Sequence, residues 1–179
     1  MITVEYYLAL LLGKIKRDKH KEILTKWFKR KGVNLPDGEY VYINSNIAVG
    51  EPHLITIGGN TTIAGGVHLI THDNSISKIL TDTTDIFGRI TIGRNCFVGQ
   101  NAIVLYGVTI ADNVIVAAGS VVTKSIKDSY VIVAGNPARV ISTWENFGEK
   151  NMPFTYNLWE MPRSEMIRRT TNGERLIEK

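Results

Sequence analysis

The chain has 179 residues, of which 44% are hydrophobic and 21% charged, so it can bury a sizeable core and is not an extended disordered protein. Its single cysteine, Cys96, excludes an internal disulfide framework and favours a reducing, cytoplasmic setting. The net charge of +4 is uneven, because residues 1–31 contain nine Lys/Arg and three Asp/Glu, whereas residues 32–179 contain twelve and fourteen. The rest of the chain is therefore slightly acidic, which argues against nucleic acid as a partner.

Residues 1–38 are predicted to form a basic helical arm. Apolar residues at helical spacing make two groups, Tyr6, Tyr7, Leu10 and Leu11, and then Ile23, Leu24, Trp27 and Phe28. Two interpretations follow for residues 1–31: a helix that packs on the end of the body with a solvated basic face, or a helix that contacts an anionic membrane surface peripherally. The apolar run Tyr6–Leu12 is too short to span a bilayer, and Gly32 is expected to end the arm.

A six-residue period dominates the middle of the chain. A branched aliphatic residue returns at every sixth position, at Ile92, Val98, Val104, Ile110, Val116 and Val122. In most copies a small residue follows it, and three copies carry Asn three places later, at Asn95, Asn101 and Asn113. Six residues match neither the helical period nor a plain alternating strand, so the pattern is a structural repeat.

Short β segments that turn a corner every six residues would place one aliphatic side chain inward per segment. Gly and Asn tolerate the left-handed backbone conformation that such corners need. Stacked coils would lie about 4.8 Å apart and bury the aliphatic column. The alternative is a β-sandwich, whose strands recur at irregular spacing with longer turns. The period therefore favours a parallel β-helix, a solenoid that we assign to residues 39–143.

The repeat begins irregularly near Val41. One six-spaced series is Ile43, Val49 and Ile55, and a second, shifted by two residues, is Ile57, Ile63 and Leu69. The shift falls at Glu51–Leu54, which we interpret as a corner with a small insertion. The period then breaks over residues 71–89, a polar excursion, and resumes at Ile90. Long excursions from a regular scaffold are where recognition chemistry is usually placed.

After Val122 a polar turn runs to Asp128, and an apolar stretch follows to Ile141. Residues 144–179 lose the period and are predicted to form an extended C-terminal segment anchored by aromatic residues. Within it, Ser164 is expected to cap a short helix that reaches Arg169 and is broken by Gly173.

Histidine is the side chain best suited to a general base near neutral pH. His72 opens the excursion, and Asp73 is a candidate to orient its imidazole; the alternative is a loop histidine that only forms hydrogen bonds. No metal site is expected from His53, His68 and His72. The i, i+4 spacing of His68 and His72 would place both side chains on one face of a helix, but these residues lie in β-like sequence. Cys96 occupies an outer or corner position without a nucleophile signature, so we interpret it as structural.

Several motifs in this order resemble the hexapeptide-repeat acyltransferases, which fold as left-handed parallel β-helices. They are Thr71-His72-Asp73, Ile90–Gly93, Tyr106–Ile110, Ala118–Lys124 and Ala134–Ile141. The similarity covers about residues 40–141 and is greatest to the galactoside and maltose O-acetyltransferases and related sugar and polysaccharide O-acetyltransferases.

This resemblance implies a homotrimer with active sites at subunit interfaces, acetyl-CoA as the donor and a saccharide as the acceptor. The histidine that matches the family's general base is His72. The residues that match its coenzyme A site are Gln100, Ala118, Thr123, Lys124 and Arg139, and the candidate acceptor-binding residues are Asn44 and Asp73. The alternatives are that Lys124 is a solvated turn charge, that Arg139 lies over the final coil, and that Asn44 is only a corner residue.

Three departures from the galactoside and maltose enzymes bear on the acceptor: Asp73 replaces a usual Pro, Phe97 replaces a usual Trp, and the basic arm differs. They favour the branch that modifies capsule, lipopolysaccharide or other glycan precursors. The predicted reaction is acetyl transfer from acetyl-CoA to a sugar hydroxyl, with His72 as the base. The alternatives are N-acetylation of an amino sugar, a non-catalytic scaffold, and a metal enzyme of the γ-carbonic anhydrase type.

Overall fold

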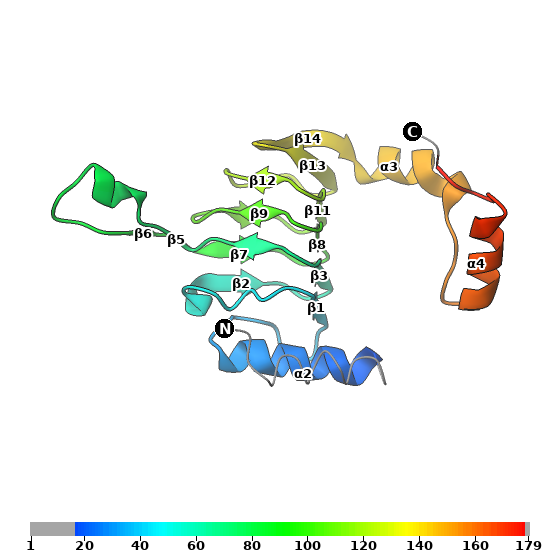
Figure 1. Ribbon diagram of the computed structural model, residues 1–179, viewed down its shortest axis with the longest axis horizontal. Coiled ribbons are helices and arrows are strands. Elements are labelled where there is room, and N and C mark those ends of the chain that lie inside the picture. The colour runs from blue at the N-terminus through cyan, green and yellow to red at the C-terminus, as the bar shows by residue number, and fades with distance from the viewer. Residues whose placement is uncertain (1–16, 178–179) are drawn as a thin grey trace. The chain divides into compact units, whose positions relative to one another are not determined.

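The computed structural model describes residues 17–177, and the side chains from residue 22 onward (Figure 1). The chain divides into two compact units, Met1–Ile141 and Ser142–Lys179. The predicted apolar group of Tyr6, Tyr7, Leu10 and Leu11 lies outside the described residues.

Short strands build the body of the first unit from three sheets, which the chain visits in turn, and a fourth, two-stranded sheet lies outside this body. The long sheet contains β1 (Val41–Ile43), β3 (Thr61–Ile63), β8 (Phe97–Val98), β11 (Val114–Val116), β13 (Val131–Gly135) and β14 (Ala138–Thr143). The β9 sheet contains β4 (His68–Leu69), β9 (Ile103–Val104) and β12 (Val121–Val122), and the β7 sheet contains β2 (Ile55–Ile57), β7 (Ile90–Ile92) and β10 (Thr109–Ile110).

The second and third coils each take one strand from each sheet, and successive coils stack with parallel register (Figure 1). The first coil is residues 41–57, the second 61–92, the third 97–110 and the fourth 114–126. The predicted parallel β-helix is therefore confirmed.

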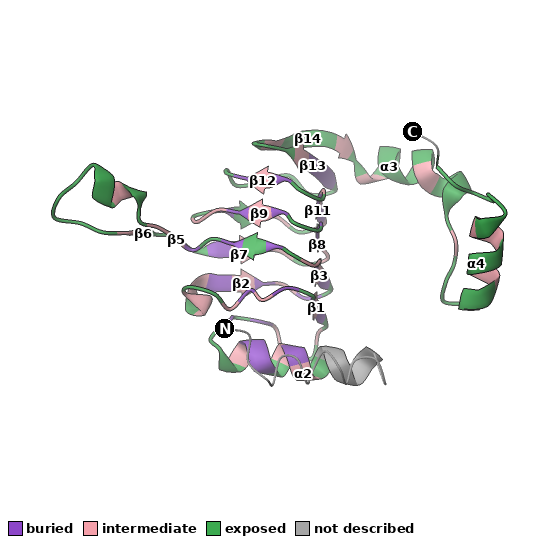
Figure 2. Cartoon of the chain, in the orientation of Figure 1, coloured by how far each residue is buried: buried purple, intermediate pink, exposed green. Residues whose placement is uncertain are grey.

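The predicted aliphatic column is also confirmed. Its six members are all 1% exposed or less: Ile92, Val98, Val104, Ile110, Val116 and Val122. They stack in pairs between the third coil and its neighbours, with Val98 beside Val116 and Val104 beside Val122. Figure 2 shows buried residues recurring along the stacked strands. Because each side chain removes its apolar surface from water, the column supplies the main stabilisation of the β-helix.

Asparagine turns the corners, as the repeat predicts. Asn95, Asn101 and Asn113 have φ of 52°, 58° and 58°, and Asn60 joins them at 56°. The side chains also bind one another between coils: Asn60 Nδ2 donates to Asn95 Oδ1 at 2.7 Å, and Asn95 Nδ2 donates to Asn113 Oδ1 at 2.8 Å. The corners at Asn60, Asn95 and Asn113 therefore combine a left-handed backbone with side-chain hydrogen bonds between coils.

The small residues that follow the aliphatic positions lie where the backbones of neighbouring coils are close together. A Cβ on Gly93 would lie 2.7 Å from the carbonyl carbon of Ala111, and one on Gly99 would lie 2.5 Å from the backbone nitrogen of Ala118. These glycines let the backbones of stacked coils approach each other.

The first coil departs from the prediction. Val49, expected to point inward, is 63% exposed, whereas Ile47 is 2% exposed and fills the core. Residues 46–49 form no strand beneath β4, so the six-residue register does not hold at this end of the stack. The predicted insertion at Glu51–Leu54 is confirmed as a short 3₁₀ helix, η1 (Pro52–Leu54).

Helix α2 (Arg17–Arg30) covers this end of the β-helix (Figure 1). Its residues Leu24, Trp27 and Phe28 are at most 5% exposed and belong to the same core as Val41. Gly32 has φ +103° and its N–H donates to Lys29 O at 2.9 Å, so it ends the helix as predicted. The described part of the arm therefore fits a helix packed on the body. No helix among residues 17–177 has the length and apolar character that crossing a bilayer requires.

The second unit is helical rather than extended, which makes that prediction wrong. It contains α3 (Trp144–Asn151), η3 (Met152–Phe154) and α4 (Arg163–Thr171). Thr143 starts α3, because its side chain accepts a hydrogen bond from Asn146 N–H at 3.2 Å. The helix expected around Ser164 is present as α4, but Pro162, not Ser164, occupies the N-cap.

The aromatic anchoring predicted for this unit is present only in part: Tyr156 donates its hydroxyl to Glu174 O and lies 5.8 Å from Arg175, but three other rings are largely exposed. Phe147, Phe154 and Trp159 are 49%, 39% and 93% exposed. Its contacts are mainly polar ones, such as the bonds from Arg168 and Arg169 to Glu165.

Candidate active site

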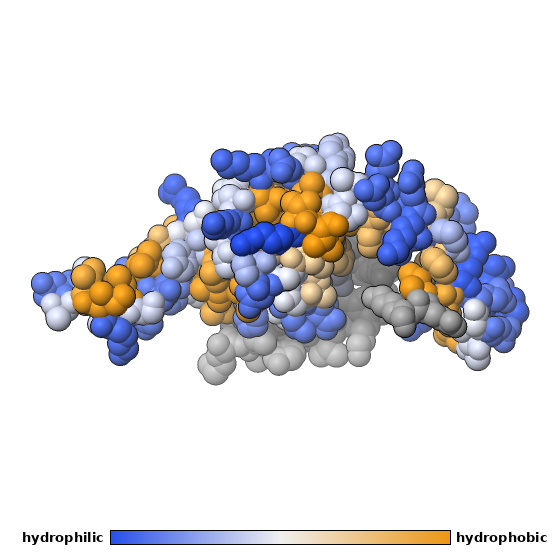
Figure 3. All heavy atoms as spheres, turned by 90° about the horizontal axis from the view of Figure 1, so that it is seen from above, coloured by the Kyte–Doolittle hydropathy of each residue, from blue (hydrophilic) through white to orange (hydrophobic). Residues whose placement is uncertain are grey.

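The excursion leaves the β-helix at the corner between β4 and β7. Its base is an antiparallel pair, β5 (His72–Asp73) and β6 (Ile86–Phe87), and η2 (Ser75–Lys78) lies beyond it. The predicted break in the repeat at residues 71–89 is therefore confirmed. The surface of the excursion is less polar than predicted. Ile79 and Phe87 are 77% and 56% exposed and contribute to an apolar area on the projecting segment (Figure 3).

His72 lies at the base of this excursion, and its side chain is 42% exposed. Its Nδ1 is 2.9 Å from Oε2 of Glu51, a residue of the first coil that directly precedes η1. On the other strand of the base, the ring of Phe87 lies 5.9 Å from the imidazole between centroids. The histidine is thus held at its Nδ1 edge while part of it remains accessible.

Glu51 also binds Thr71, the buried residue before His72. Thr71 Oγ1 donates to Glu51 Oε2 at 2.6 Å, and the backbone N–H of Glu51 donates to Thr71 Oγ1 at 3.3 Å. The Thr71 hydroxyl, followed by the contact with His72, holds the pKa of the Glu51 carboxyl below its usual range, although partial burial opposes this. Glu51 is therefore an anion at neutral pH.

Gly50 makes room for this arrangement. It has φ +75°, and a Cβ there would lie 2.9 Å from Thr71 Oγ1 and 3.5 Å from His72 Nδ1. Only glycine combines this backbone conformation with that close approach.

Asp73 does not orient the imidazole, so that prediction is wrong. Its Oδ1 accepts from Ser75 N–H at 2.8 Å, and its Oδ2 accepts from the Tyr106 hydroxyl at 3.3 Å. Successive residues of a strand point to opposite sides, which separates Asp73 from the ring beside it. The bonds from Ser75 and then Tyr106 hold the pKa of Asp73 low, whereas desolvation and the Asp73 charge raise the pKa of Tyr106. Asp73 thus ties the excursion to the third coil.

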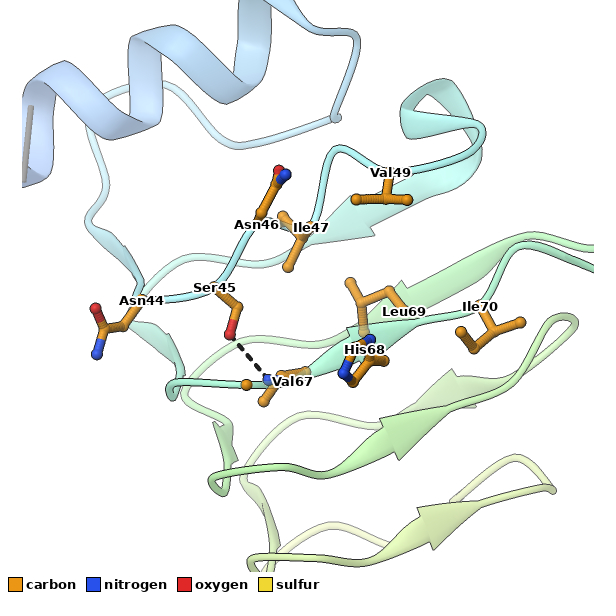
Figure 4. Close-up of a pocket in the computed structure, with 10 residues that line it drawn as sticks. Asn44, Ser45, Asn46, Ile47, Val49, Val67, His68, Leu69 and Ile70 are labelled. Carbon is orange, nitrogen blue, oxygen red and sulfur yellow. Dashed lines mark hydrogen bonds between the residues drawn. The ribbon is translucent and has the colours of Figure 1, made fainter. Parts of the chain in front are cut away.

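Asn44 borders a cavity of about 420 Å³ between the first and second coils (Figure 4). The cavity is also lined by Ser45 and Val67, which are joined by a hydrogen bond of 2.9 Å from Val67 N–H to Ser45 Oγ. Figure 4 shows the Asn44 amide directed away from the other lining side chains. Asn44 and Glu51 both belong to the first coil, between β1 and β2. Among the described residues, no hydrogen bond joins Asn44 to His72.

The five residues matched to a coenzyme A site occupy exposed positions on the upper coils. Gln100 and Ala118 lie at one corner, where Gly119 N–H donates to Gln100 O at 2.8 Å. Thr123 and Lys124 follow β12 directly, at the opposite edge of the β9 sheet, and Arg139 lies in β14. Within residues 22–177, no ion pair involves Lys124 or Arg139.

The remaining candidates have plainer surroundings. His53 lies in η1 and His68 in β4, both exposed, and the described residues contain no group of three His, Cys, Asp or Glu side chains suited to a metal ion. Cys96 is 4% exposed, so it lies inside the corner rather than outside it. Burial raises the pKa of its thiol, which keeps it protonated and agrees with a structural role.

Residues 89–124 match the family model described as the hexapeptide repeat of succinyl-transferase. Galactoside O-acetyltransferase of Escherichia coli (strain K12) is 37% identical over 111 residues, 62% of this chain and 54% of that protein. Protein CapG of Staphylococcus aureus is 39% identical over 116 residues, 64% of this chain and 67% of that protein.

A solved structure adds a likeness in three dimensions. The hexapeptide-repeat containing acetyltransferase of Vibrio cholerae O1 biovar eltor, complexed with acetyl coenzyme A, has 28% identity and a TM-score of 0.54, over 63% of this chain and 61% of that one. The chain spans about half the length of the Escherichia coli galactoside enzyme. The stacked six-residue coils and these likenesses show that the chain belongs to the hexapeptide-repeat acetyltransferase family, close to the galactoside O-acetyltransferases.

Proposed function

We propose that the protein transfers an acetyl group from acetyl-CoA to a hydroxyl of a sugar or glycan precursor. The observation that carries the proposal is His72, half-exposed at the base of the excursion, on the β-helix of an acetyltransferase family. Two relatives support its two halves: one is named for O-acetylation of galactosides, and another was solved with acetyl coenzyme A.

In this reaction His72 is the general base. Its imidazole takes the proton from the acceptor hydroxyl as the oxygen attacks the thioester carbonyl. The new C–O bond forms, the C–S bond breaks, and the proton on the imidazole goes to the coenzyme A sulfur. No covalent enzyme intermediate is needed, which fits a buried, protonated Cys96.

In this proposal, acetyl-CoA binds along the upper coils. Lys124 and Arg139 are exposed cations that suit the phosphates of coenzyme A. Thr123 and Gln100 add polar groups, and the small Ala118 lets the pantetheine arm lie against the backbone. On the acceptor side, the proposal keeps Asn44 and Asp73 as sugar contacts.

We propose a homotrimer as the working assembly, because two sheets differ on their outer sides. On the β7 sheet the outward residues in register are Thr56, Thr91 and Thr109. On the long sheet they are Tyr42, Thr62, Phe97 and Ile115, of which Phe97 is 44% exposed. The more apolar face suits contact with a second copy, and analytical ultracentrifugation tests for the trimer.

The decisive experiment is an acceptor screen monitored by release of the free coenzyme A thiol. We expect turnover with a saccharide or glycan precursor, and a loss of roughly 10²–10⁴-fold in His72→Ala. Full activity of that variant would remove His72 from the chemistry. Failure of the wild-type protein to bind acetyl-CoA in calorimetry would point instead to a scaffold. Treating the product with hydroxylamine separates the two acetylation chemistries, because an ester is cleaved and an amide is not.

A further inference from the structure

We propose that Glu51 is the positioning residue of His72: from the coil below, its carboxylate fixes both the orientation of the ring and the tautomer that leaves Nε2 as the base. The catalytic consequence rests on the proposed function, whereas the structural part concerns only these two side chains. The Nδ1–Oε2 distance is 2.9 Å, and Glu51 is 24% exposed in its side chain.

The tautomer follows from what a carboxylate can do. An ionised carboxylate has no hydrogen to donate, so a hydrogen bond of this length needs the hydrogen on Nδ1 of His72. A neutral imidazole carries one ring hydrogen, so Nε2 keeps its lone pair. That nitrogen is then the atom able to take a proton from an acceptor.

Glu51 is itself held in place by Thr71. The hydroxyl of Thr71, a residue only 2% exposed, donates to the same Oε2 at 2.6 Å. The backbone N–H of Glu51 returns a bond to that hydroxyl at 3.3 Å. The two residues that open the excursion therefore both bind one carboxylate, and the carboxylate cannot turn away from His72 without breaking the bond from Thr71.

No other carboxylate of the described residues that lies near the ring has this role. The oxygens of Asp73 are bound to Ser75 N–H and the Tyr106 hydroxyl, on the opposite side of β5. Phe87 lies beside the ring with a 44° angle between planes and offers no hydrogen-bond acceptor. Between residues 22 and 177, Glu51 is the side chain that can select the tautomer of His72.

The first test is kinetic. Glu51→Gln keeps the size of the side chain but removes the charge, and we expect kcat to fall by about 10- to 100-fold with little change in KM for acetyl-CoA. Glu39→Gln is the matched control, because Glu39 is also partly exposed and binds Arg94 at 2.6 Å, away from the excursion. Circular dichroism melts of both variants check that they fold.

The second test does not depend on activity. ¹⁵N-histidine NMR, with His72→Asn used for assignment, should show the Nδ1–H tautomer of His72 in the wild-type protein. In Glu51→Gln it should move toward the Nε2–H tautomer that free histidine favours in water. A wild-type Nε2–H tautomer, or unchanged kcat and tautomer in Glu51→Gln, would overturn the positioning role. An Nδ1–H tautomer together with full activity of His72→Ala would instead remove the general-base role from His72 and leave the contact between Glu51 and His72 intact.

Discussion

Replacing Gly50 by alanine tests whether the root of the excursion is as tightly built as its contacts indicate. Gly50 sits at φ +75°, and the added methyl carbon would lie 2.9 Å from Thr71 Oγ1. The variant therefore places a strained backbone and a steric contact at the hydroxyl that holds Glu51.

The expected loss of folding free energy has two parts. A left-handed backbone costs a residue other than glycine about 1–2 kcal/mol. Displacing the Thr71 hydroxyl disturbs its hydrogen bond to Glu51, which adds about 1–3 kcal/mol for a largely buried group. Gly38→Ala isolates the first part, because Gly38 has φ +71° and a Cβ added there would meet no atom within 4 Å.

Urea denaturation at neutral pH measures both variants. We expect Gly50→Ala to lose about 1–3 kcal/mol more than Gly38→Ala, which is the hydrogen-bond part alone. Acetyl transfer should fall in Gly50→Ala and stay at the wild-type level in Gly38→Ala. Equal destabilisation of the two variants, with equal activity, would refute the claim that Gly50 is required by its neighbours.

Three further predictions follow from the coils and from the C-terminal helices. Val98→Ala, in the buried column, should lower the free energy of unfolding by about 2–3 kcal/mol in urea titrations, while the exposed Val49→Ala changes it by less than about 0.5 kcal/mol; similar losses would mean that the column is not the core. Tyr106→Phe removes the bond to Asp73, so trypsin should cut at Lys78 faster with little change in melting temperature, and an unchanged cutting rate would contradict the tether. The pKa of Glu165 is lowered to about 2 by Arg168 and then Arg169, so its contribution to α4 is present above about pH 4.5 and lost as pH falls toward 2. Circular dichroism should show helix loss in that window for the wild-type protein and a weaker pH dependence for Glu165→Gln.

The body of the fold was predictable because its geometry repeats locally. Every regular coil meets the same need, so an inward aliphatic residue such as Val104 and a corner residue such as Asn101 recur at a fixed distance. The first coil lacked that regularity: with no strand beneath β4, the inward position moved from Val49 to Ile47. An end effect of this kind depends on what covers the stack, which a period cannot reveal.

The site was predictable only in part. His72 was marked by the break in the repeat, but Glu51 was missed because it lies 21 residues earlier. A signal was available, since stacked corners recur at 18 residues, as between Asn95 and Asn113. The residue about one coil before His72 in the sequence is Glu51. The corresponding residue about one coil after His72, once the excursion is left out, is Tyr106. Helix α3 was missed as well, although Thr143 is a residue type that favours a helix N-cap.

Stability and chemistry occupy different positions of each coil in this molecule. The inward column needs only branched aliphatic side chains, so the identity of a residue such as Val116 does not depend on the substrate. The corners point outward and carry Glu51 and Thr123. The excursion begins at such a corner of the second coil, between the first coil and the third. The coil below binds its first residues through Glu51, and the coil above binds Asp73 through Tyr106. The stacked coils thus hold His72 and Asp73, the first strand of the excursion, from two sides, while the rest of the excursion projects beyond them. Column variants should therefore lower stability with kcat/KM unchanged, whereas Glu51→Gln should lower kcat while the protein stays folded.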